Sequence, residues 1–224
     1  MAFDVASLRL CLVTDRGLAA GRSVVDVALA AARGGATLVQ LREKAATTRA
    51  FIEQARALKA ALAPLGVPLA INDRLDVALA VDADGLHVGQ DDMPVEEARR
   101  LLGPGKFIGL SITALDQALR ADAEAADYLG VGPIYAQATK SDAAPPLGID
   151  GLRRIRGLTR KPIVAIGGLT PDNGAPALAA GADGLAVVSA IVAAADPEAA
   201  ARRFRALFGG AGGSRESAVG SRRS

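Results

Sequence analysis

Several residue types are scarce in this chain of 224 residues, and each scarcity excludes a class of protein. Tryptophan is absent and aromatic residues make up 3%, so a nucleic-acid reader that stacks bases on aromatic rings is not expected. A single cysteine, Cys11, cannot form an internal disulfide and suits a reducing compartment. With one histidine, His87, and no G-x-S-x-G motif, the chain also lacks the residues for a histidine-based zinc cluster or a serine triad. We interpret Cys11 and His87 as interior residues.

Long apolar runs are missing as well. The longest uncharged run near the end of the chain, Gly184–Ala195, is too short to cross a bilayer. The first residues include Asp4 and Arg9 and do not have the pattern of a signal peptide. We therefore expect a cytoplasmic protein without a membrane partner.

The net charge of +2 is small, and its position along the chain matters. Residues 209–224 contain three arginines and one glutamate, so they account for the whole excess and leave residues 1–208 neutral. A basic groove for nucleic acid is not indicated. The same stretch is rich in glycine and serine without periodicity, and we predict a flexible tail over residues 209–224 after one domain over residues 1–208.

Short runs rich in valine, isoleucine and leucine alternate with longer, alanine-rich amphipathic stretches such as Val24–Arg33 and Thr48–Ala63. Each short run has the length of a strand buried on both faces. The expected strands are Leu8–Thr14, Thr37–Leu41, Pro68–Ile71, Gly85–Val88, Phe107–Ser111, Tyr128–Val131, Pro162–Ile166 and Gly184–Val188.

Eight strand-plus-helix units predict parallel strands joined by crossover helices, and hence a single-domain α/β fold, the (β/α)8 TIM barrel. A doubly wound open sheet is the alternative, but its G-x-G-x-x-G turn is missing. Ser23 and Asp196 are placed to cap the first and last helices, and glycines at Gly34-Gly35 and Gly181 suit helix ends.

Polar residues cluster where the strands end, which is where a barrel of this type carries its active site. Gln40, Arg42 and Lys44 occupy alternate positions after the second run. Alternate residues of a strand share a face, so two cations and an amide are predicted to lie together as an anion site.

Carboxylates follow the next two runs, in Asn72-Asp73-Arg74 and in Gly89-Gln90-Asp91-Asp92. Carboxylates near arginine and lysine indicate Mg²⁺ that bridges to phosphate oxygens. Asp92 is the preferred second ligand, and Asp91 is its rival. Either aspartate could instead cap the helix that opens near Pro94.

The later strand ends carry weaker signals. Ser111, taken alone, is more typical of a helix cap. The long connection of residues 132–148 is typical of a functional loop and holds Thr139 and Lys140. Gly167-Gly168 after the seventh run and Ser189 after the eighth match the phosphate site that recurs in this fold. Two phosphate sites with a metal between them favour substitution at carbon with loss of diphosphate.

Taken together in order, these motifs resemble those of the thiamine-phosphate synthase and thiazole tautomerase superfamily, over nearly the whole chain from Leu8 to Phe208. The segments that carry the resemblance are Gln40–Lys44, Ile71–Arg74, His87–Asp92, Gly109–Ser111, Gly132–Tyr135 with Thr139-Lys140, Ala165–Gly168 and Val187–Ile191.

The resemblance to thiamine-phosphate synthase implies a magnesium-dependent transferase. Its small-molecule substrates would be 4-amino-2-methyl-5-(diphosphooxymethyl)pyrimidine and a thiazole phosphate, in its carboxylate form, and the products thiamine phosphate and pyrophosphate. By motif position, Gln40, Arg42, Lys44, Asn72, Ser111 and Lys140 would hold the pyrimidine diphosphate, with Arg42, Lys44, Ser111 and Lys140 acting in catalysis. Asp73 and Asp92 would hold Mg²⁺. The thiazole phosphate would contact Gln137, Thr139, Gly168, Val188 and Ser189.

One position departs from the family pattern, because Gln137 stands where the family loop often has threonine. A thiazole tautomerase, another phosphate-binding barrel such as an isomerase of tryptophan or histidine synthesis, and a non-catalytic phosphate-binding barrel remain as alternatives. The joint presence of carboxylates and diphosphate-binding cations argues against all three. The sequence leaves the oligomeric state open, a homo-oligomer included.

Overall fold

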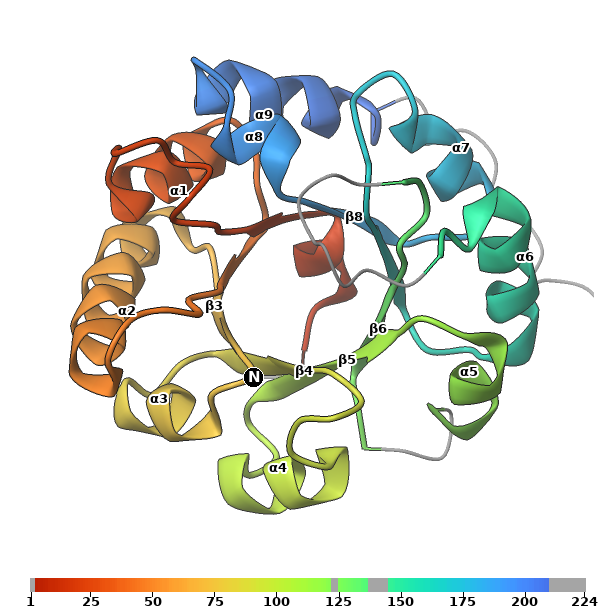
Figure 1. Ribbon diagram of the computed structural model, residues 1–224, viewed down its shortest axis with the longest axis horizontal. Coiled ribbons are helices and arrows are strands. Elements are labelled where there is room, and N and C mark those ends of the chain that lie inside the picture. Colours follow the sequence, from red (N-terminus) through yellow and green to blue (C-terminus); the bar gives the residue numbers. More distant parts are fainter. Residues whose placement is uncertain (1–2, 122–124, 137–144, 210–224) are drawn as a thin grey trace, which may run out of the picture.

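Eight parallel strands close into a barrel in the computed structural model, which describes residues 3–121, 125–136 and 145–209 (Figure 1). Each strand pairs with the next, and β8 pairs back onto β1, with Leu12 opposite Val187. The predicted (β/α)8 barrel is confirmed, and the open-sheet alternative is wrong. The strands are β1 Leu10–Val13, β2 Leu38–Leu41, β3 Leu69–Asn72, β4 Gly85–Val88, β5 Phe107–Ile112, β6 Tyr128–Val131, β7 Ile163–Ile166 and β8 Gly184–Val187.

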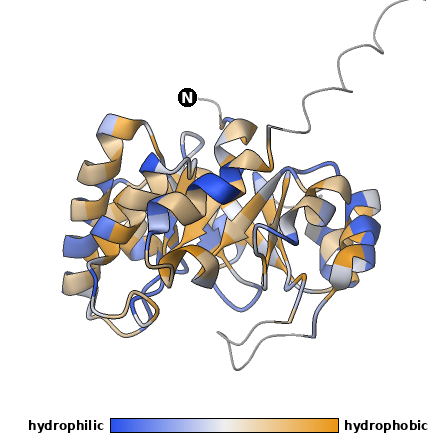
Figure 2. Ribbon diagram, turned by 90° about the horizontal axis from the view of Figure 1, so that it is seen from above, coloured by the Kyte–Doolittle hydropathy of each residue, from blue (hydrophilic) through white to orange (hydrophobic). Residues whose placement is uncertain are grey.

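Helices form a ring outside the strands (Figure 1). Their inner faces are apolar and pack against the strands. Figure 2 shows mostly orange strands in the middle of the molecule and helices that carry both orange and blue residues. The helices are α1 Val24–Arg33, α2 Thr48–Leu62, α3 Leu75–Ala80, α4 Val95–Leu102, α5 Leu115–Ala121, α6 Gly148–Leu158, α7 Gly174–Ala179, α8 Ser189–Val192 and α9 Pro197–Ala206, with 3-10 turns η1 Val5–Leu8 and η2 Ala63–Leu65. Within the described ranges, none of them is both long and apolar enough to span a bilayer.

Two predicted caps are confirmed. Ser23 Oγ accepts a hydrogen bond from the Asp26 amide at 3.3 Å, and an Asp196 carboxylate oxygen accepts one from the Ala199 amide at 2.9 Å. These bonds satisfy amides that have no partner within the helix. Gly35 and Gly181 follow α1 and α7 with φ of 106° and 103°, the left-handed conformation that glycine adopts without a Cβ penalty.

The first strand is shorter than predicted, because Leu8 belongs to η1 and β1 begins at Leu10. Leu8 is fully buried and packs, together with Phe3, against the side chains that fill the barrel interior. The red N-terminal segment accordingly lies inside the ring of strands in Figure 1. An apolar run cannot distinguish a strand from an apolar plug, since both bury every side chain.

Candidate functional site

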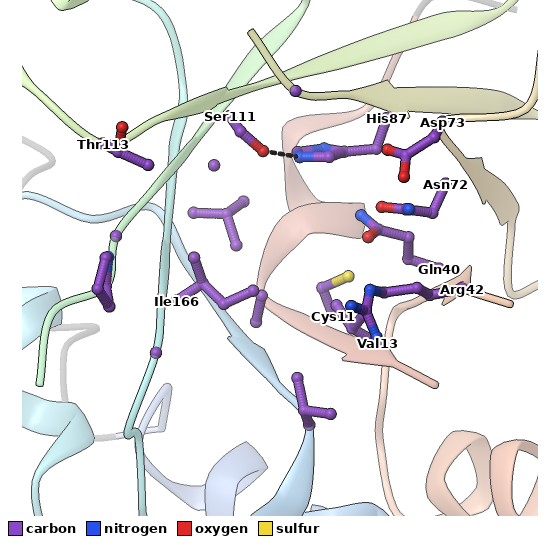
Figure 3. Close-up of a pocket in the computed structure, with 18 of the residues that line it drawn as sticks. Cys11, Val13, Gln40, Arg42, Asn72, Asp73, His87, Ser111, Thr113 and Ile166 are labelled. Carbon is purple, nitrogen blue, oxygen red and sulfur yellow. Dashed lines mark hydrogen bonds between the residues drawn. The ribbon is translucent and has the colours of Figure 1, made fainter. Parts of the chain in front are cut away.

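A cavity of about 640 Å³ opens within the barrel and extends to the loops that follow the strands (Figure 3). Its volume is in the range of small-molecule sites. The wall contributed by β2 to β5 and their loops is mostly polar, and the wall from β6 to β8 and β1 is mostly apolar. The polar residues are Asp15, Gln40, Arg42, Lys44, Asn72, Asp73, His87, Gln90, Asp91, Asp92, Ser111, Thr113, Gln117 and Tyr128; the apolar ones include Cys11, Val13, Val164, Ile166, Ala186 and Val188.

The predicted cluster of Gln40, Arg42 and Lys44 lies on the cavity wall. The loop after β1 holds the backbone and side chain of Arg42. The Thr14 hydroxyl accepts a hydrogen bond from the Arg42 amide at 3.0 Å, and an Asp15 carboxylate oxygen lies 3.3 Å from Arg42 Nη1. These contacts hold Arg42 on the cavity wall.

Glu43 lies between Arg42 and Lys44 in sequence but does not line the cavity. Its side chain is 4% exposed, and its Oε2 lies 2.6 Å from Nε of Arg16, also in the loop after β1. The alternation predicted for residues 40–44 therefore holds. Gln40, Arg42 and Lys44 line the cavity, whereas Glu43 binds Arg16 and so connects the loops after β1 and β2.

Asp73 and Asp92 come from neighbouring strand ends, and Asp92 acts on the carboxyl group of Asp73. Burial raises the pKa of Asp73 to about 6, and the neighbouring Asp92 adds to this effect, while Arg42 and Asn72 oppose it. Like charges at close range disfavour the doubly ionised state. A divalent cation bound by both carboxylates would relieve that conflict, so this carboxylate pair fits Mg²⁺.

Neither Asp91 nor Asp92 caps α4, and that reading of the sequence is wrong. The helix begins at Val95 after Pro94, without a side-chain cap. Asp92 instead accepts a hydrogen bond from the Gly89 amide at 2.7 Å through Oδ2. This bond ties the carboxyl group to the loop after β4. Asp91 also lines the cavity, so it remains a rival ligand.

Ser111 is not a helix cap either. It lies in β5, and its Oγ is 2.9 Å from Nε2 of His87 (Figure 3). The cap before α5 is supplied by Gln117, whose Oε1 accepts a hydrogen bond from the Thr113 amide at 2.7 Å. The hydroxyl of Ser111 is thus left for the cavity, where its role as a substrate-binding residue stays a prediction.

His87 and Cys11 are buried, as predicted for interior residues, yet both also line the cavity floor. Burial lowers the pKa of His87 to about 4 and raises that of the Cys11 thiol to about 12. Near neutral pH both side chains are uncharged. A nucleophilic thiolate is therefore not available at Cys11.

The predicted phosphate site after β7 and β8 lies at the edge of the cavity. Gly167 and Val188 belong to its lining, while Gly168 and Ser189 each lie one residue further along the chain. Gly168 has a φ of 65°, and a Cβ there would lie 2.7 Å from the carbonyl oxygen of Ala136. Glycine is therefore required for this close loop contact. Phosphate binding by Gly168, Val188 and Ser189 stays a prediction.

Gln137, Thr139 and Lys140, predicted from the long loop after β6, lie outside the described residues. Their roles stay predictions. The described ends of that loop, Tyr135 and Leu147, both pack against the core of the barrel.

The sequence interpretation missed several residues of the site. Thr14 and Asp15 were not predicted as supports for Arg42. Tyr128 was predicted only as the first residue of a strand, yet its hydroxyl lies 2.9 Å from Nδ1 of His87. Gln90 also donates a hydrogen bond to the Ser111 carbonyl at 2.7 Å. The one signal in the sequence for the role of Thr14 and Asp15 is their position as a polar pair directly after a strand.

These features define a class of protein: a (β/α)8-barrel enzyme whose cavity, at the carboxyl ends of the strands, combines cations with a carboxylate pair. Residues 10–191 match the sequence profile of the family described as thiamine monophosphate synthase. The chain belongs to this family, whose enzymes are transferases.

The names of individual relatives agree with this family assignment. The chain is 59% identical to "Thiamine-phosphate synthase" of Chloroflexus aurantiacus, over 91% of this chain and 94% of the relative. It is 56% identical to the protein of the same name from Albidiferax ferrireducens, over 93% and 96% of the two chains. A solved structure, "Thiamine phosphate pyrophosphorylase from Pyrococcus furiosus", is similar with a TM-score of 0.85 and 38% identity, over 93% of this chain and 99% of that one.

Proposed function

We propose that the chain joins 4-amino-2-methyl-5-(diphosphooxymethyl)pyrimidine to a thiazole phosphate and releases pyrophosphate. The observation that carries this proposal is the placement of Arg42 and Lys44 on the same cavity wall as the Asp73–Asp92 pair. The charge of Arg42 acts on Asp73 directly, since it opposes the rise in the pKa of that carboxyl. A diphosphate bound to cations on one side and to a carboxylate-held metal on the other would complete this arrangement.

In this proposal the reaction is a substitution at the exocyclic carbon of the pyrimidine. The bond from this carbon to the diphosphate oxygen breaks, and the diphosphate takes the electron pair. Arg42, Lys44, Ser111 and Lys140 bind the leaving group and stabilise the charge that accumulates on it. The thiazole nitrogen then supplies its lone pair to the carbon, so no general base is needed. This fits a site whose single histidine is buried and neutral.

Gln40 and Asn72 would orient the pyrimidine from the polar wall, which both residues line. The opposite apolar wall, with Val164 and Ile166, suits the faces of heteroaromatic rings. Gln137, Thr139, Gly168, Val188 and Ser189 would hold the thiazole phosphate at the rim. In this arrangement the two phosphorylated groups bind on opposite sides of the reacting carbon.

Asp73 and Asp92 would hold Mg²⁺, which would neutralise charge on the diphosphate when it is bound. Two carboxylates leave the remaining positions of an octahedral ion for diphosphate oxygens and water. Throughout the described ranges, no group of three or more histidine, cysteine or acidic side chains is placed to hold a metal ion. A metal held by two carboxylates and completed by substrate agrees with that composition.

An endpoint assay tests the proposal. Purified protein receives both substrates and Mg²⁺, with an EDTA control, and oxidation converts thiamine phosphate to fluorescent thiochrome phosphate. We expect product that disappears with EDTA, and a severe loss of turnover in Lys140→Ala without a change in fold.

Folded protein that gives no product would overturn the proposal. Thiazole tautomerisation would be the next activity to assay, and binding without pyrophosphate release would indicate a non-catalytic barrel. The proposal includes a cytoplasmic location, supported by the lone buried Cys11. The possibility of a homo-oligomer is tested by light scattering of the purified chain.

A further inference from the structure

A chain of buried hydrogen bonds lies in the barrel interior beneath the cavity. His87 is at its centre: Nδ1 lies 2.9 Å from the hydroxyl oxygen of Tyr128, and Nε2 lies 2.9 Å from Oγ of Ser111 (Figure 3). These hydrogen bonds connect Tyr128 on β6, through His87 on β4, with Ser111 on β5. The proposed function assigns Ser111 to the pyrimidine diphosphate.

Two glycines make room for these rings. A Cβ on Gly109 would lie 2.2 Å from Cζ of Tyr128 and 2.4 Å from Nδ1 of His87, and a Cβ on Gly130 would lie 2.9 Å from Cε1 of His87. Tyr128 is 2% exposed and His87 8%. The rings thus fill the space that β5 and β6 leave, and neither ring has space to turn.

Each ring nitrogen of His87 lies beside one hydroxyl group, which can donate or accept a hydrogen bond. An imidazole with one ring proton makes one of these bonds as donor and the other as acceptor. Two arrangements of hydrogens satisfy both of its nitrogens. In one, Nδ1–H donates to Tyr128 and the Ser111 hydroxyl donates to Nε2. In the other, the Tyr128 hydroxyl donates to Nδ1, and Nε2–H donates to Ser111 Oγ.

Tyr128 discriminates between the two arrangements. Burial raises the pKa of its phenol well above the ordinary value, so the phenol keeps its proton. If His87 donated to the phenol oxygen, the phenol hydrogen would need an acceptor other than His87. Among the hydrogen bonds of residues 3–121, 125–136 and 145–209, the Tyr128 hydroxyl has His87 Nδ1 as its one partner. A buried hydroxyl hydrogen without a partner destabilises the fold, so the phenol donates to Nδ1.

We propose that His87 is held as the Nε2–H tautomer, and that it is a positioning residue that turns the Ser111 hydroxyl into a hydrogen-bond donor toward the anionic group of the substrate. Because Ser111 accepts from His87, its own hydrogen is free to point into the cavity. Tyr128 fixes the tautomer, and the glycines on β5 and β6 permit the arrangement. The identity of the anion rests on the proposed function, whereas the tautomer rests on the fold alone.

The single histidine makes the tautomer directly measurable. The full chain is labelled with ¹⁵N-histidine, any histidine tag is removed, and long-range ¹H–¹⁵N spectra are recorded near neutral pH without ligand. We expect an unprotonated Nδ1 and a protonated Nε2 from the one imidazole. A protonated Nδ1, or a doubly protonated ring, overturns the proposal whether or not the chain is active.

The matched variants are Tyr128→Phe and Tyr135→Phe, since these are the two tyrosines of the chain. Tyr128→Phe keeps the ring but removes the donor to Nδ1, and we expect a mixture of tautomers and kcat/KM for the pyrimidine diphosphate about tenfold lower, with an unchanged KM for the thiazole phosphate. Tyr135→Phe removes a hydroxyl that donates to the Asn173 carbonyl, and the imidazole spectrum should not change.

Two substitutions of the histidine separate positioning from packing. His87→Gln can place an amide N–H where Nε2–H donates, whereas His87→Asn is too short to reach Ser111. We expect His87→Gln to retain about tenfold more activity than His87→Asn. Equal losses, or the reverse order, contradict the proposal. If the wild-type chain itself gives no thiamine phosphate, the proposed function fails, and the spectrum still decides the tautomer.

Discussion

Two features of Asp73 destabilise the folded protein. Its φ of 62° places a non-glycine residue in the left-handed region, and its carboxyl group lies beside that of Asp92. Left-handed backbone costs about 1 kcal/mol for such a residue, and asparagine tolerates it as well as aspartate does. Strain and charge conflict at one position are typical of a site that awaits a ligand.

The charge conflict predicts how stability depends on pH. Because the pKa of Asp73 is raised from 3.8 to about 6 in the folded protein, the folded state keeps this proton up to a higher pH than the unfolded chain does. Stability from this group is therefore greatest below pH 3.8 and falls as the pH rises to about 6. His87, whose pKa is lowered, contributes a slope of the opposite sign over a similar range.

Asp73→Asn isolates this effect, because the contribution of His87 is common to both proteins. In EDTA at neutral pH we expect the variant to be more stable than the wild type by about 1 kcal/mol, a figure reduced for the partial solvent exposure of Asp73. Below pH 3.8 the difference should disappear. Thermal unfolding across this pH range measures it. Mg²⁺ should raise the Tm of the wild type alone, and an equal rise in the variant would remove Asp73 from the metal site.

Gly109 yields a second prediction for a single residue. Gly109→Ala should destabilise the fold by about 2 kcal/mol or more, because the new Cβ would meet two buried rings that cannot move aside. Gly157→Ala is the matched control: Gly157 lies in α6, and apart from its neighbours in the helix no atom lies within 4 Å of a Cβ placed there. It should stabilise by about 0.5 kcal/mol through helix propensity. Chemical denaturation compares them, and similar effects would contradict this account of Gly109.

Neighbouring loops support the cavity at the scale of elements. The loop after β1 braces the loop after β2 through Arg16–Glu43 and Asp15–Arg42. It also reaches across the barrel seam, where Arg22 Nη1 donates to the Ala194 carbonyl at 2.7 Å, just after α8. One loop thus supports both proposed anion sites, through different arginines.

Arg16→Ala should weaken the binding of pyrophosphate with Mg²⁺ by about fivefold and leave thiazole phosphate binding unchanged. The buried Glu43 carboxylate would lose its cation, and the loop that carries Arg42 and Lys44 would loosen. Isothermal titration with each ligand measures both affinities. Arg153→Ala is the control, because the Arg153–Asp150 pair on α6 is 60% and 89% exposed and contributes little. Equal loss of both ligands would contradict a local brace.

Arg22→Ala should show the opposite selectivity. Its guanidinium donates to the carbonyls of Val192 and Ala194, and cations at such carbonyls stabilise a helix end. We expect thiazole phosphate to bind about fivefold more weakly, with pyrophosphate affinity unchanged. The same titrations test it, and a weaker affinity for pyrophosphate alone would reverse our assignment of the two loops.

At the scale of the whole molecule, closure of the ring depends on α9. This helix packs against α1, and a Cβ on Gly34 would lie 2.2 Å from the carbonyl oxygen of Glu198. Ala201 and Phe204 of α9 are fully buried. Helix α9 therefore covers the seam where β8 meets β1.

Two truncations test the predicted domain of residues 1–208. A chain that ends at Gly209 should retain its activity and unfold within about 1 °C of the full chain, because the barrel and its ring of helices are complete by that residue. A chain that ends at Asp196 should lose at least about 3 kcal/mol, since the loss of Phe204 alone exposes a large part of the core. Calorimetry compares the three chains, and a large loss from the first truncation would disprove the boundary.

Much of the fold could be predicted because local patterns encode it. Apolar runs and amphipathic stretches determined the strands and helices, and Ser23 and Asp196 determined two helix starts. The alternation of Gln40, Arg42 and Lys44 on one face followed from strand geometry alone. The sequence determined which chemical groups stand at the strand ends, and its motifs resembled one family.

Only the tertiary structure decided which of these groups meet. Asp73 and Asp92 conflict because closure of the barrel brings two strand ends together, and Glu43 is buried because Arg16 comes from another loop. His87, Tyr128 and Ser111 lie on three different strands, and their hydrogen bonds exist only in the space that Gly109 and Gly130 leave. Contacts between residues distant in sequence, and the burial that sets their pKa values, depend on closure of the barrel, which no local pattern records.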